Sequence, residues 1–324
     1  MNSSKKIIYR AAIIGAGRIG CGFDSPGSKD VLTHAHALAL NPRMKLVALV
    51  DKNSARGRKE ARRWKTEFFT DIDLMFKKTK PDAVIIATPD ETHADMLVRV
   101  LEMRPRLVVC EKPVVTARKD IVRVKRAAAR AGVPVIVNFG LRFAPSVEEL
   151  RRDIARGRFG KVLCANGIYV RGILNNGSHM LDLARFLFGE MKKSSAHFMR
   201  RDVSGGVPSF AGVASFERCP QFSIQNGGRR YWVFELDLLT EKKRFRITNE
   251  GFSLVTQDVV NDPRYKGFRT LGPPSVKKTG LMNAMRALAA HSVRVLDRDE
   301  KPRSTLSDAL KTHSACLSFA EGFK

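Results

Sequence analysis

Residues 7–20 read Ile-Ile-Tyr-Arg-Ala-Ala-Ile-Ile-Gly-Ala-Gly-Arg-Ile-Gly, an apolar run that passes directly into the pattern G-x-G-x-x-G. The run predicts a β-strand, and glycines in this position are typical of the first βαβ unit of a dinucleotide-binding domain. The first glycine makes a tight turn, the second lets the backbone approach a pyrophosphate, and the third lets a helix pack closely. We therefore expect cofactor phosphates at a helix N-terminus here, held by Gly15, Gly17, Arg18, Ile19 and Gly20.

A glycine turn before a helix also forms for packing alone, so the next strand serves as a check. Residues 46–50 predict a strand that ends in Asp51, whose carboxylate can accept hydrogen bonds from both hydroxyls of a ribose. A carboxylate repels a 2′-phosphate, which indicates NAD rather than NADP. Lys52 and Arg56 lie close enough in the sequence to leave NADP possible.

The interval between Gly20 and Asp51 is longer than the roughly 20 positions usual in such a unit. The excess corresponds to residues 21–31, whose glycines, serines and proline cannot continue a helix. We expect an inserted loop at the cofactor site, either a lid or a surface excursion, with a helix from Thr33 to Leu40.

Strands and helices alternate over the rest of the first half, which indicates a doubly wound parallel sheet. The expected strands lie at 82–87, 108–110 and 133–137, and the expected helices between them at 93–103 and 117–131.

Polar residues follow these strands, and ligands of an open parallel sheet bind beyond its carboxyl ends. Glu111-Lys112-Pro113 comes directly after one strand, and the proline prevents the strand from continuing. A partly shielded lysine can have its proton affinity lowered and serve as an acid or base, although many lysines after strands are simply solvated. Asn138 follows the last strand and can either contact a nicotinamide carboxamide or cap a turn.

The composition is that of a packed protein with two domains. The chain has 324 residues, of which 44% are hydrophobic, and we place the domains at 1–140 and 141–324. The five cysteines are scattered, which argues against a disulfide scaffold or a metal site. Arg10 interrupts the first apolar run, which therefore resembles a strand more than a signal peptide, and no apolar stretch is long enough to cross a membrane. We expect a soluble, cytoplasmic protein.

The net charge of +26 is the most unusual bulk property. It can mean a nucleic-acid partner or an anionic substrate. The basic residues are spread along the chain without interleaved aromatics, so we expect no specific nucleic-acid partner. We favour a generally basic surface that helps to capture an anionic ligand as a secondary effect.

In the second half the alternation stops. Residues 162–171 predict a strand, and 179–188 a helix with Ser178 as its N-cap. His179 and Asp182 share a helix face, and the dipole of the first turn would lower the proton affinity of the histidine, unless it merely caps the helix. Apolar residues at 232, 234, 236 and 238 alternate with polar ones, which predicts an open, mostly antiparallel sheet covered on one face by helices at 282–296 and 306–319.

Several motifs in this order resemble the glucose–fructose oxidoreductase / inositol dehydrogenase / rhizopine-catabolism (Gfo/Idh/MocA) family. They are the glycine pattern, Asp51, Thr88-Pro89 with His93, Glu111-Lys112-Pro113, Arg142-Phe143 and Asn176-Gly177-Ser178-His179-Met180-Leu181-Asp182. The resemblance implies an α/β Rossmann domain followed by an α+β domain, whose uncovered sheet face often forms a homodimer or homotetramer. It also implies that Lys112 is the catalytic lysine and His179 its partner.

The resemblance further implies two sets of binding residues. The cofactor residues are those of the glycine pattern together with Asp51, Lys52, Thr88, Pro89, His93, Glu111, Lys112 and Asn138. The substrate residues are Lys112, Arg142, Tyr169, Arg171, Asn175, Asn176, His179 and Asp182.

One position departs from the family. Members often have an aspartate four residues before the histidine, where this chain has Asn175. A neutral amide cannot be a base, so the proton transfer would rest on Lys112 and His179. The Gly-x-Leu-Asn-Asn-Gly-Ser-His form of residues 172–179, with Tyr169 and Arg171 just before it, resembles a branch associated with surface-polysaccharide sugars. With the basic net charge, this implies a nucleotide-linked sugar whose diphosphate Arg142 or Arg171 binds.

We therefore expect an NAD(P)-dependent oxidoreductase that transfers a hydride between nicotinamide and a sugar or polyol. The alternative is a non-catalytic NAD- and sugar-binding regulator of the same fold. Asn175 is compatible with that alternative, and the retained Lys112 and His179 argue against it.

Overall fold

The computed structural model describes residues 7–200 and 208–321 and contains two compact units. The first unit comprises residues 1–140 and 282–310, and the second comprises 141–281 and 311–324. The expected boundary at 140 agrees with this division, but residues 282–310 do not belong with the second unit. They pack on the first because Asp297 accepts a hydrogen bond from the Tyr9 hydroxyl (2.6 Å) and binds Arg43 through both carboxylate oxygens.

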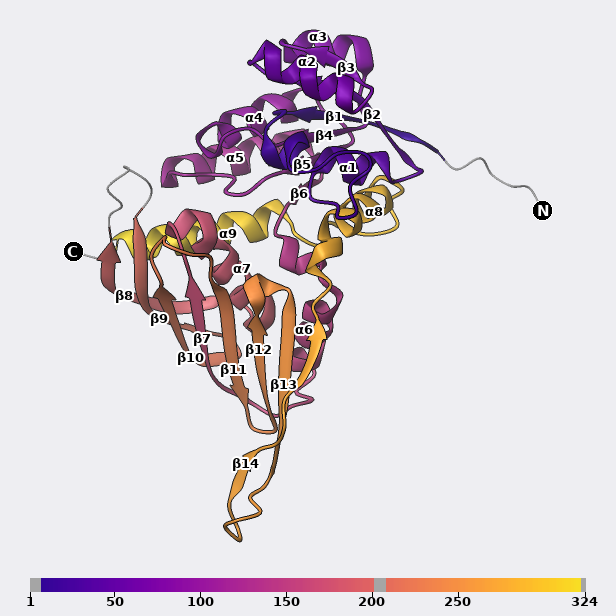
Figure 1. The fold of residues 1–324 in the computed structure, drawn as a ribbon. Helices are drawn as coiled ribbons and strands as arrows, with labels where there is room; N and C mark the ends of the chain where they lie inside the picture. Colours follow the sequence, from indigo (N-terminus) through magenta and orange to yellow (C-terminus); the bar gives the residue numbers. More distant parts are fainter. Residues whose placement is uncertain (1–6, 201–207, 322–324) are drawn as a thin grey trace. The chain divides into compact units, whose positions relative to one another are not determined.

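The first unit is built on a six-stranded parallel sheet in the order β3-β2-β1-β4-β5-β6. Its β-branched strands are buried on both faces, as expected for a doubly wound sheet (Figure 1). The strands are β1 (Tyr9–Ile14), β2 (Met44–Val50), β3 (Glu67–Phe69), β4 (Ala83–Ile86), β5 (Leu107–Cys110) and β6 (Val135–Val137). The helices are η1 (Arg18–Gly22), α1 (His34–Ala39), α2 (Ser54–Arg63), α3 (Ile72–Thr79), η2 (Asp90–Thr92), α4 (His93–Glu102), α5 (Arg118–Ala131) and α8 (Ala284–Leu296), the last preceded by η6 (Leu281–Asn283).

The segment 21–31 is folded around one buried carboxylate. Asp24 is 8% exposed and accepts hydrogen bonds from the backbone N–H groups of Leu32 (2.6 Å) and Thr33 (3.1 Å). His36 lies 2.9 Å away through Nδ1. Opening this segment would break these buried contacts, so the geometry favours a structured excursion over a lid. The helix after it begins beyond its N-cap Thr33, as predicted.

The second unit is built on a nine-stranded sheet in which β14-β13-β12-β11-β7-β10-β9-β8 are neighbours and β15 pairs with β13. Among the described strands of this second sheet, every pairing is antiparallel except that of β7 with β10. The strands are β7 (Val162–Tyr169), β8 (Met191–Arg200), β9 (Ser209–Phe216), β10 (Cys219–Asn226), β11 (Phe234–Thr240), β12 (Lys243–Thr248), β13 (Ser253–Asn261), β14 (Arg269–Leu271) and β15 (Ser275–Lys278).

Helices cover one face of this sheet (Figure 1). Phe234, Leu236 and Leu238 alternate inward, as predicted, and join a core with residues of the covering helices. The helices and turns of the unit are η3 (Gly140–Phe143), α6 (Pro145–Ala155), η4 (Ile173–Gly177), α7 (Ser178–Phe188), η5 (Asn249–Gly251) and the second half of α9 (Leu306–Glu321). The predicted fold class, an α/β Rossmann unit and an α+β unit with a one-sided sheet, is confirmed.

Candidate functional site

The glycine loop after β1 has the geometry that a pyrophosphate requires. Gly15 has φ +102°, and a Cβ there would lie 2.4 Å from the carbonyl oxygen of Ala87. A Cβ at Gly20 would lie 2.2 Å from the Gly15 carbonyl oxygen, so both positions require glycine. A Cβ at Gly17 would meet nothing within 4 Å, which leaves the space for a ligand to approach the backbone. The turn that follows is the short π-helix η1, with Arg18 exposed.

Asp51 at the end of β2 is buried, and both its oxygens already have partners. Oδ2 accepts from the Ala16 N–H (2.9 Å) and Oδ1 from the Asn53 N–H (2.8 Å), while Arg56 binds the two oxygens through Nε (3.0 Å) and Nη2 (2.9 Å). Burial alone would raise the pKa of Asp51, but the hydrogen bonds from Arg56, Asn53 and Ala16 outweigh it and hold that pKa below its ordinary value. Arg56, half-exposed, is therefore part of the expected ribose site, whereas Lys52 points to solvent.

The end of β5 carries a buried carboxylate held by two neighbours. Glu111 Oε1 lies 2.8 Å from His34 Nε2 and accepts a hydrogen bond from Asn138 Nδ2 (2.7 Å). Burial would raise the pKa of Glu111, but the bonds from His34 and Asn138 prevail and lower it to about 2. Lys112, half-buried, follows directly and is joined to Pro113 by a cis peptide bond.

Two features of this cluster differ from the expectation. Asn138 neither caps a turn through its side chain nor stands free, because it holds Glu111. Its Oδ1 is buried and has no partner among the described residues, so one acceptor is available to a ligand. His34 was not identified from the sequence, since a histidine that begins a helix carries no signal for a contact 77 residues away.

His93 ties two strand ends together. It is 1% exposed, and its ring nitrogens lie 2.8 Å from the Pro113 carbonyl oxygen and 2.7 Å from that of Thr88. Thr88 also accepts a hydrogen bond from Thr92 Oγ1 (2.8 Å), and Pro89 is exposed beside it. His93 therefore fixes the loops after β4 and β5 relative to one another.

In the second unit, Arg142 and Asp182 form a buried ion pair. Arg142 Nε and Nη2 each lie 2.8 Å from a carboxylate oxygen, and the two residues are 4% and 2% exposed. Thr312 Oγ1 also donates to Asp182 (3.2 Å). The guanidinium of Arg142, which was expected to bind a substrate diphosphate, thus binds the Asp182 carboxylate of the same unit instead. The two opposite charges are buried together, so each compensates the other.

Tyr169 was expected near the substrate, and the structure contradicts this. It is fully buried, and its hydroxyl donates to the carbonyl oxygen of Phe210 (2.7 Å) and accepts from the N–H of Phe210 (2.9 Å). Burial raises the pKa of this phenol. Tyr169 is a core residue that joins β7 to β9.

The prediction that Ser178 is an N-cap is also wrong. Helical backbone already begins at Ile173 with the π-helix η4, and Ser178 Oγ donates to the carbonyl oxygen of Asn175 (2.7 Å). His179, half-buried, therefore does not lie at the free start of a helix, and the dipole argument for it does not apply. Asn176 is buried, and its Nδ2 has no partner among the residues that the structure describes.

Arg171 is exposed, and its guanidinium carbon lies 4.7 Å from the ring centre of Trp232. The alternating pattern placed Trp232 on the buried face with Phe234, Leu236 and Leu238, but it is 43% exposed because it precedes β11 and stacks on Arg171.

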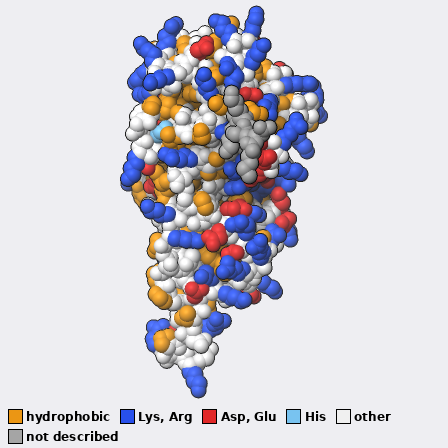
Figure 2. All heavy atoms as spheres, turned by 90° about the vertical axis from the view of Figure 1, so that its right-hand side faces the viewer, with side chains coloured by type: hydrophobic (Ala, Val, Ile, Leu, Met, Phe, Trp, Pro, Cys, Tyr) orange, Lys and Arg blue, Asp and Glu red, His pale blue; other side chains and the backbone are white. Residues whose placement is uncertain are grey.

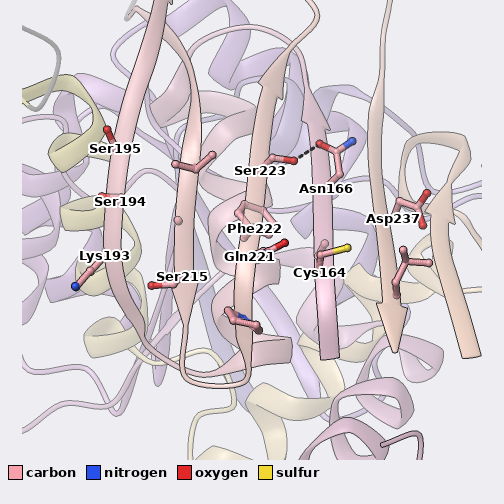
Figure 3. Close-up of a pocket in the computed structure, with 15 residues that line it drawn as sticks. Cys164, Asn166, Lys193, Ser194, Ser195, Ser215, Gln221, Phe222, Ser223 and Asp237 are labelled. Atoms are coloured by element: carbon pink, nitrogen blue, oxygen red, sulfur yellow. Dashed lines mark hydrogen bonds between the residues drawn. The ribbon is translucent and has the colours of Figure 1, made fainter. Parts of the chain in front are cut away.

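The outer face of the second sheet carries a separate hollow of about 760 Å³. Figure 3 shows its lining on the strands, including Cys164 and Asn166 on β7, Ser223 on β10 and Ser215 on β9. Ser223 donates a hydrogen bond to Asn166 (2.6 Å). The lining includes Lys193 and Asp237 but none of the residues expected to bind cofactor or substrate.

Lysine and arginine side chains are dispersed over the face in Figure 2, with carboxylates among them.

Over residues 7–200 and 208–321, no helix has the length and apolar character to span a membrane.

Comparison with known proteins supports the reading of the first unit. Residues 9–139 match the family model GFO_IDH_MocA, described as an oxidoreductase family with an NAD-binding Rossmann fold. Inositol 2-dehydrogenase 2 of Saccharopolyspora erythraea is 33% identical over 202 residues, which cover 57% of each chain. The chain spans about half the length of the curated relatives it matches.

Solved structures share the fold of nearly the whole chain. The WlbA dehydrogenase from Bordetella pertussis, in complex with NADH and UDP-GlcNAcA, has a TM-score of 0.77 at 19% identity over 99% of this chain and 96% of that one. A lysine-to-glutamate mutant of KijD10, a 3-ketoreductase from Actinomadura kijaniata, in complex with TDP-benzene and NADP, has a TM-score of 0.76 at 15% identity over 97% of this chain and 98% of that one.

Proposed function

We propose that this chain belongs to the Gfo/Idh/MocA oxidoreductase family, whose model residues 9–139 match, and that it is an NAD(P)-dependent oxidoreductase acting on a sugar or polyol hydroxyl. The single observation that carries the proposal is the β5 end, where Lys112 follows a buried, doubly held carboxylate. The inositol dehydrogenases among its relatives support the substrate class. A nucleotide-linked sugar of a surface polysaccharide is the finer proposal, supported by the two ligand complexes with nucleotide derivatives.

The residues present fit NAD. The open backbone at Gly17 suits a pyrophosphate, Asp51 with Arg56 suits an adenosine ribose, and the unpartnered Oδ1 of Asn138 suits a carboxamide N–H of nicotinamide. When bound, the dinucleotide supplies the hydride acceptor or donor. NAD is the proposed cofactor, with NADP possible because Arg56 offsets the charge of Asp51.

The chain itself provides orientation and proton transfer. In the oxidation, Lys112 Nζ or the ring of His179 would take the proton of the substrate hydroxyl, and in the reduction the same group would return it. A dinucleotide held by the glycine loop and Asp51 would accept the hydride in the first direction and supply it in the second, so that alcohol and ketone interconvert. Glu111 fixes the backbone that carries Lys112, because His34 and Asn138 hold its carboxylate in place. Asn175 is a neutral amide and supplies no second base, so the proposed proton transfer rests on Lys112 and His179.

The test is Lys112→Ala, with the exposed Lys119→Ala as matched control. We expect Lys112→Ala to lower kcat by about 10²- to 10⁴-fold while the affinity for NADH changes by only a few-fold. Lys119→Ala should leave both quantities unchanged. Near-normal turnover of Lys112→Ala would refute the proposal. A wild-type protein that binds cofactor and sugar without any change in absorbance at 340 nm would instead support the regulatory alternative.

We also propose that a second copy of this chain covers the outer sheet face in a homodimer or homotetramer. Helices cover only one face of the sheet in the described residues, and the other is lined by short side chains such as Ser215 and Ser223. Ser215→Arg should shift the mass in light scattering toward the monomer, and an unchanged mass would contradict this interface. A cytoplasmic location and the absence of a specific nucleic-acid partner stay predictions.

A further inference from the structure

The ends of three strands of the second unit converge on Arg171. Its backbone N–H donates to the carbonyl oxygen of Gly228 (2.9 Å), and its own carbonyl oxygen accepts from Ser209 Oγ (2.8 Å) and Asn226 Nδ2 (2.9 Å). Asn226 Oδ1 in turn accepts from the Gly228 N–H (3.0 Å). Arg171 thereby lies at φ +66°, a left-handed conformation that costs free energy for a side chain other than glycine or asparagine. Such a cost is kept where the position of the side chain matters.

The side chain held in this way forms an exposed basic and aromatic surface with the loop after β10. Its guanidinium stacks on Trp232 at 4.7 Å, and Trp232 and Tyr231 remain 43% and 73% exposed. Arg230 in the same loop is exposed, and a Cβ at Gly228 would lie only 2.6 Å from Arg200 Nη1, so that guanidinium borders the loop as well.

Among the described residues, no acidic side chain compensates the charge of this surface. No carboxylate within residues 7–200 and 208–321 lies within 4 Å of a guanidinium nitrogen of Arg171, Arg200 or Arg230. Other arginines of the unit do have such a partner, for example Arg142, Arg244 and Arg264. Exposed aromatics beside arginines without acidic partners suit a ligand that is flat at one end and anionic at the other.

We propose that Arg171 and Trp232, with Tyr231 and Arg200, form the subsite for the nucleoside diphosphate of a nucleotide-linked sugar substrate. The base stacks on the exposed aromatic rings, and the diphosphate meets the arginines, whose planar forks bind phosphate oxygens in pairs. The sugar then points along the segment that runs from Arg171 through η4 to His179. This inference rests on the proposed function for the reaction and adds to it the class of substrate.

The test is calorimetric binding of UDP to the full chain saturated with NAD, so that the glycine loop is not available to the probe. Wild-type protein should bind UDP more tightly than uridine or inorganic pyrophosphate alone, because the subsite uses both halves. Arg171→Ala and Trp232→Ala should each weaken UDP binding by about tenfold or more. Trp232→Phe should restore most of the loss. Arg264→Ala, which removes an exposed arginine of the β13–β14 hairpin, is the matched control and should change nothing.

The outcomes separate this inference from the proposed reaction. Lys112→Ala should bind UDP like the wild type, since Lys112 is not part of the subsite. If the protein oxidises free sugars but does not bind UDP, the proposed subsite is overturned and the oxidoreductase proposal stands. Unchanged UDP affinity in Arg171→Ala and Trp232→Ala would also overturn it, as would an Arg171-dependent preference for a single-stranded oligonucleotide over UDP.

Discussion

Removing Asp182 should destabilise the second unit severely, because the neighbouring Arg142 is almost fully buried. The two residues are 2% and 4% exposed and joined by two hydrogen bonds of 2.8 Å. Loss of one partner of such a pair typically costs about 3–5 kcal/mol, since the other charge is left in a poorly solvated place. A whole domain is stable by only about 5–15 kcal/mol. Asp182→Leu should therefore lower the free energy of unfolding of this unit by roughly 3–5 kcal/mol.

Urea denaturation followed by tryptophan fluorescence measures this change, since Trp232 lies in the second unit and Trp64 in the first. The double variant Arg142→Met/Asp182→Leu should recover most of the loss, because it removes both charges. Glu148→Ala is the control: its pair with Arg151 is partly exposed and should contribute less than about 1 kcal/mol.

A loss below about 1 kcal/mol in Asp182→Leu would refute the structural role of the pair. The double variant decides its functional role as well. If Arg142 held the substrate, this variant would be folded yet bind substrate far more weakly. We expect it to be folded and to bind substrate normally.

Three other perturbations follow from the buried hydrogen bonds. The folded-state pKa of Glu111 is about 2 and its ordinary value is 4.5, so the ionised group stabilises the fold above pH 4.5 by roughly 3 kcal/mol. This contribution is lost as the pH falls from 4.5 toward 2. The difference in urea midpoint between wild type and Glu111→Gln should therefore shrink over that pH range, and a constant difference would contradict the expectation. Tyr169→Phe removes the hydroxyl that bonds both the N–H and the carbonyl of Phe210 and should cost about 1–3 kcal/mol in urea denaturation with KM unchanged, whereas a raised KM would return Tyr169 to the substrate site. Arg56→Ala should weaken NADP binding by about tenfold relative to NAD in fluorescence titrations, and equal losses for both would exclude Arg56 from cofactor choice.

The first unit was largely predictable because its signals are local. The β-branched runs, the glycine pattern and the αL glycine after α5 each act within a few residues, and they predicted five of the six strands of this sheet to within two or three residues at either end. Strand β3 was missed because Glu67–Phe69 is short and begins with a charged residue, and only its pairing with β2 makes it a strand. Residues 282–310 were assigned to the wrong unit, since the bonds of Asp297 to Tyr9 and Arg43 span most of the chain.

The candidate site was less predictable because a motif gives the identity of a residue and not its partner. Tyr169 and Arg171 are two positions apart in the same motif. The Tyr169 hydroxyl is nevertheless hydrogen-bonded to the backbone of Phe210 in the core, whereas the Arg171 side chain is exposed and stacks on Trp232. Both outcomes depend on residues about 40 to 60 positions further along the chain, which no local pattern reveals. For the same reason, the sequence does not reveal the contact between His34 and Glu111, which lie 77 residues apart.

His179 shows how such a contact changes the chemistry that can be inferred. Asn175-Asn176-Gly177 has the composition of a turn, and a serine after it has that of an N-cap. The backbone instead forms a π-helical turn, closed by the Gly177 N–H on the carbonyl oxygen of Gly172 (3.3 Å), a rare geometry without a sequence signature. The positive end of the helical segment then lies beside Arg171, where anionic groups are favoured, and not at His179. Asn175 lies four residues before His179, so restoring a carboxylate with Asn175→Asp should alter the pH profile of kcat more than the stability of the fold.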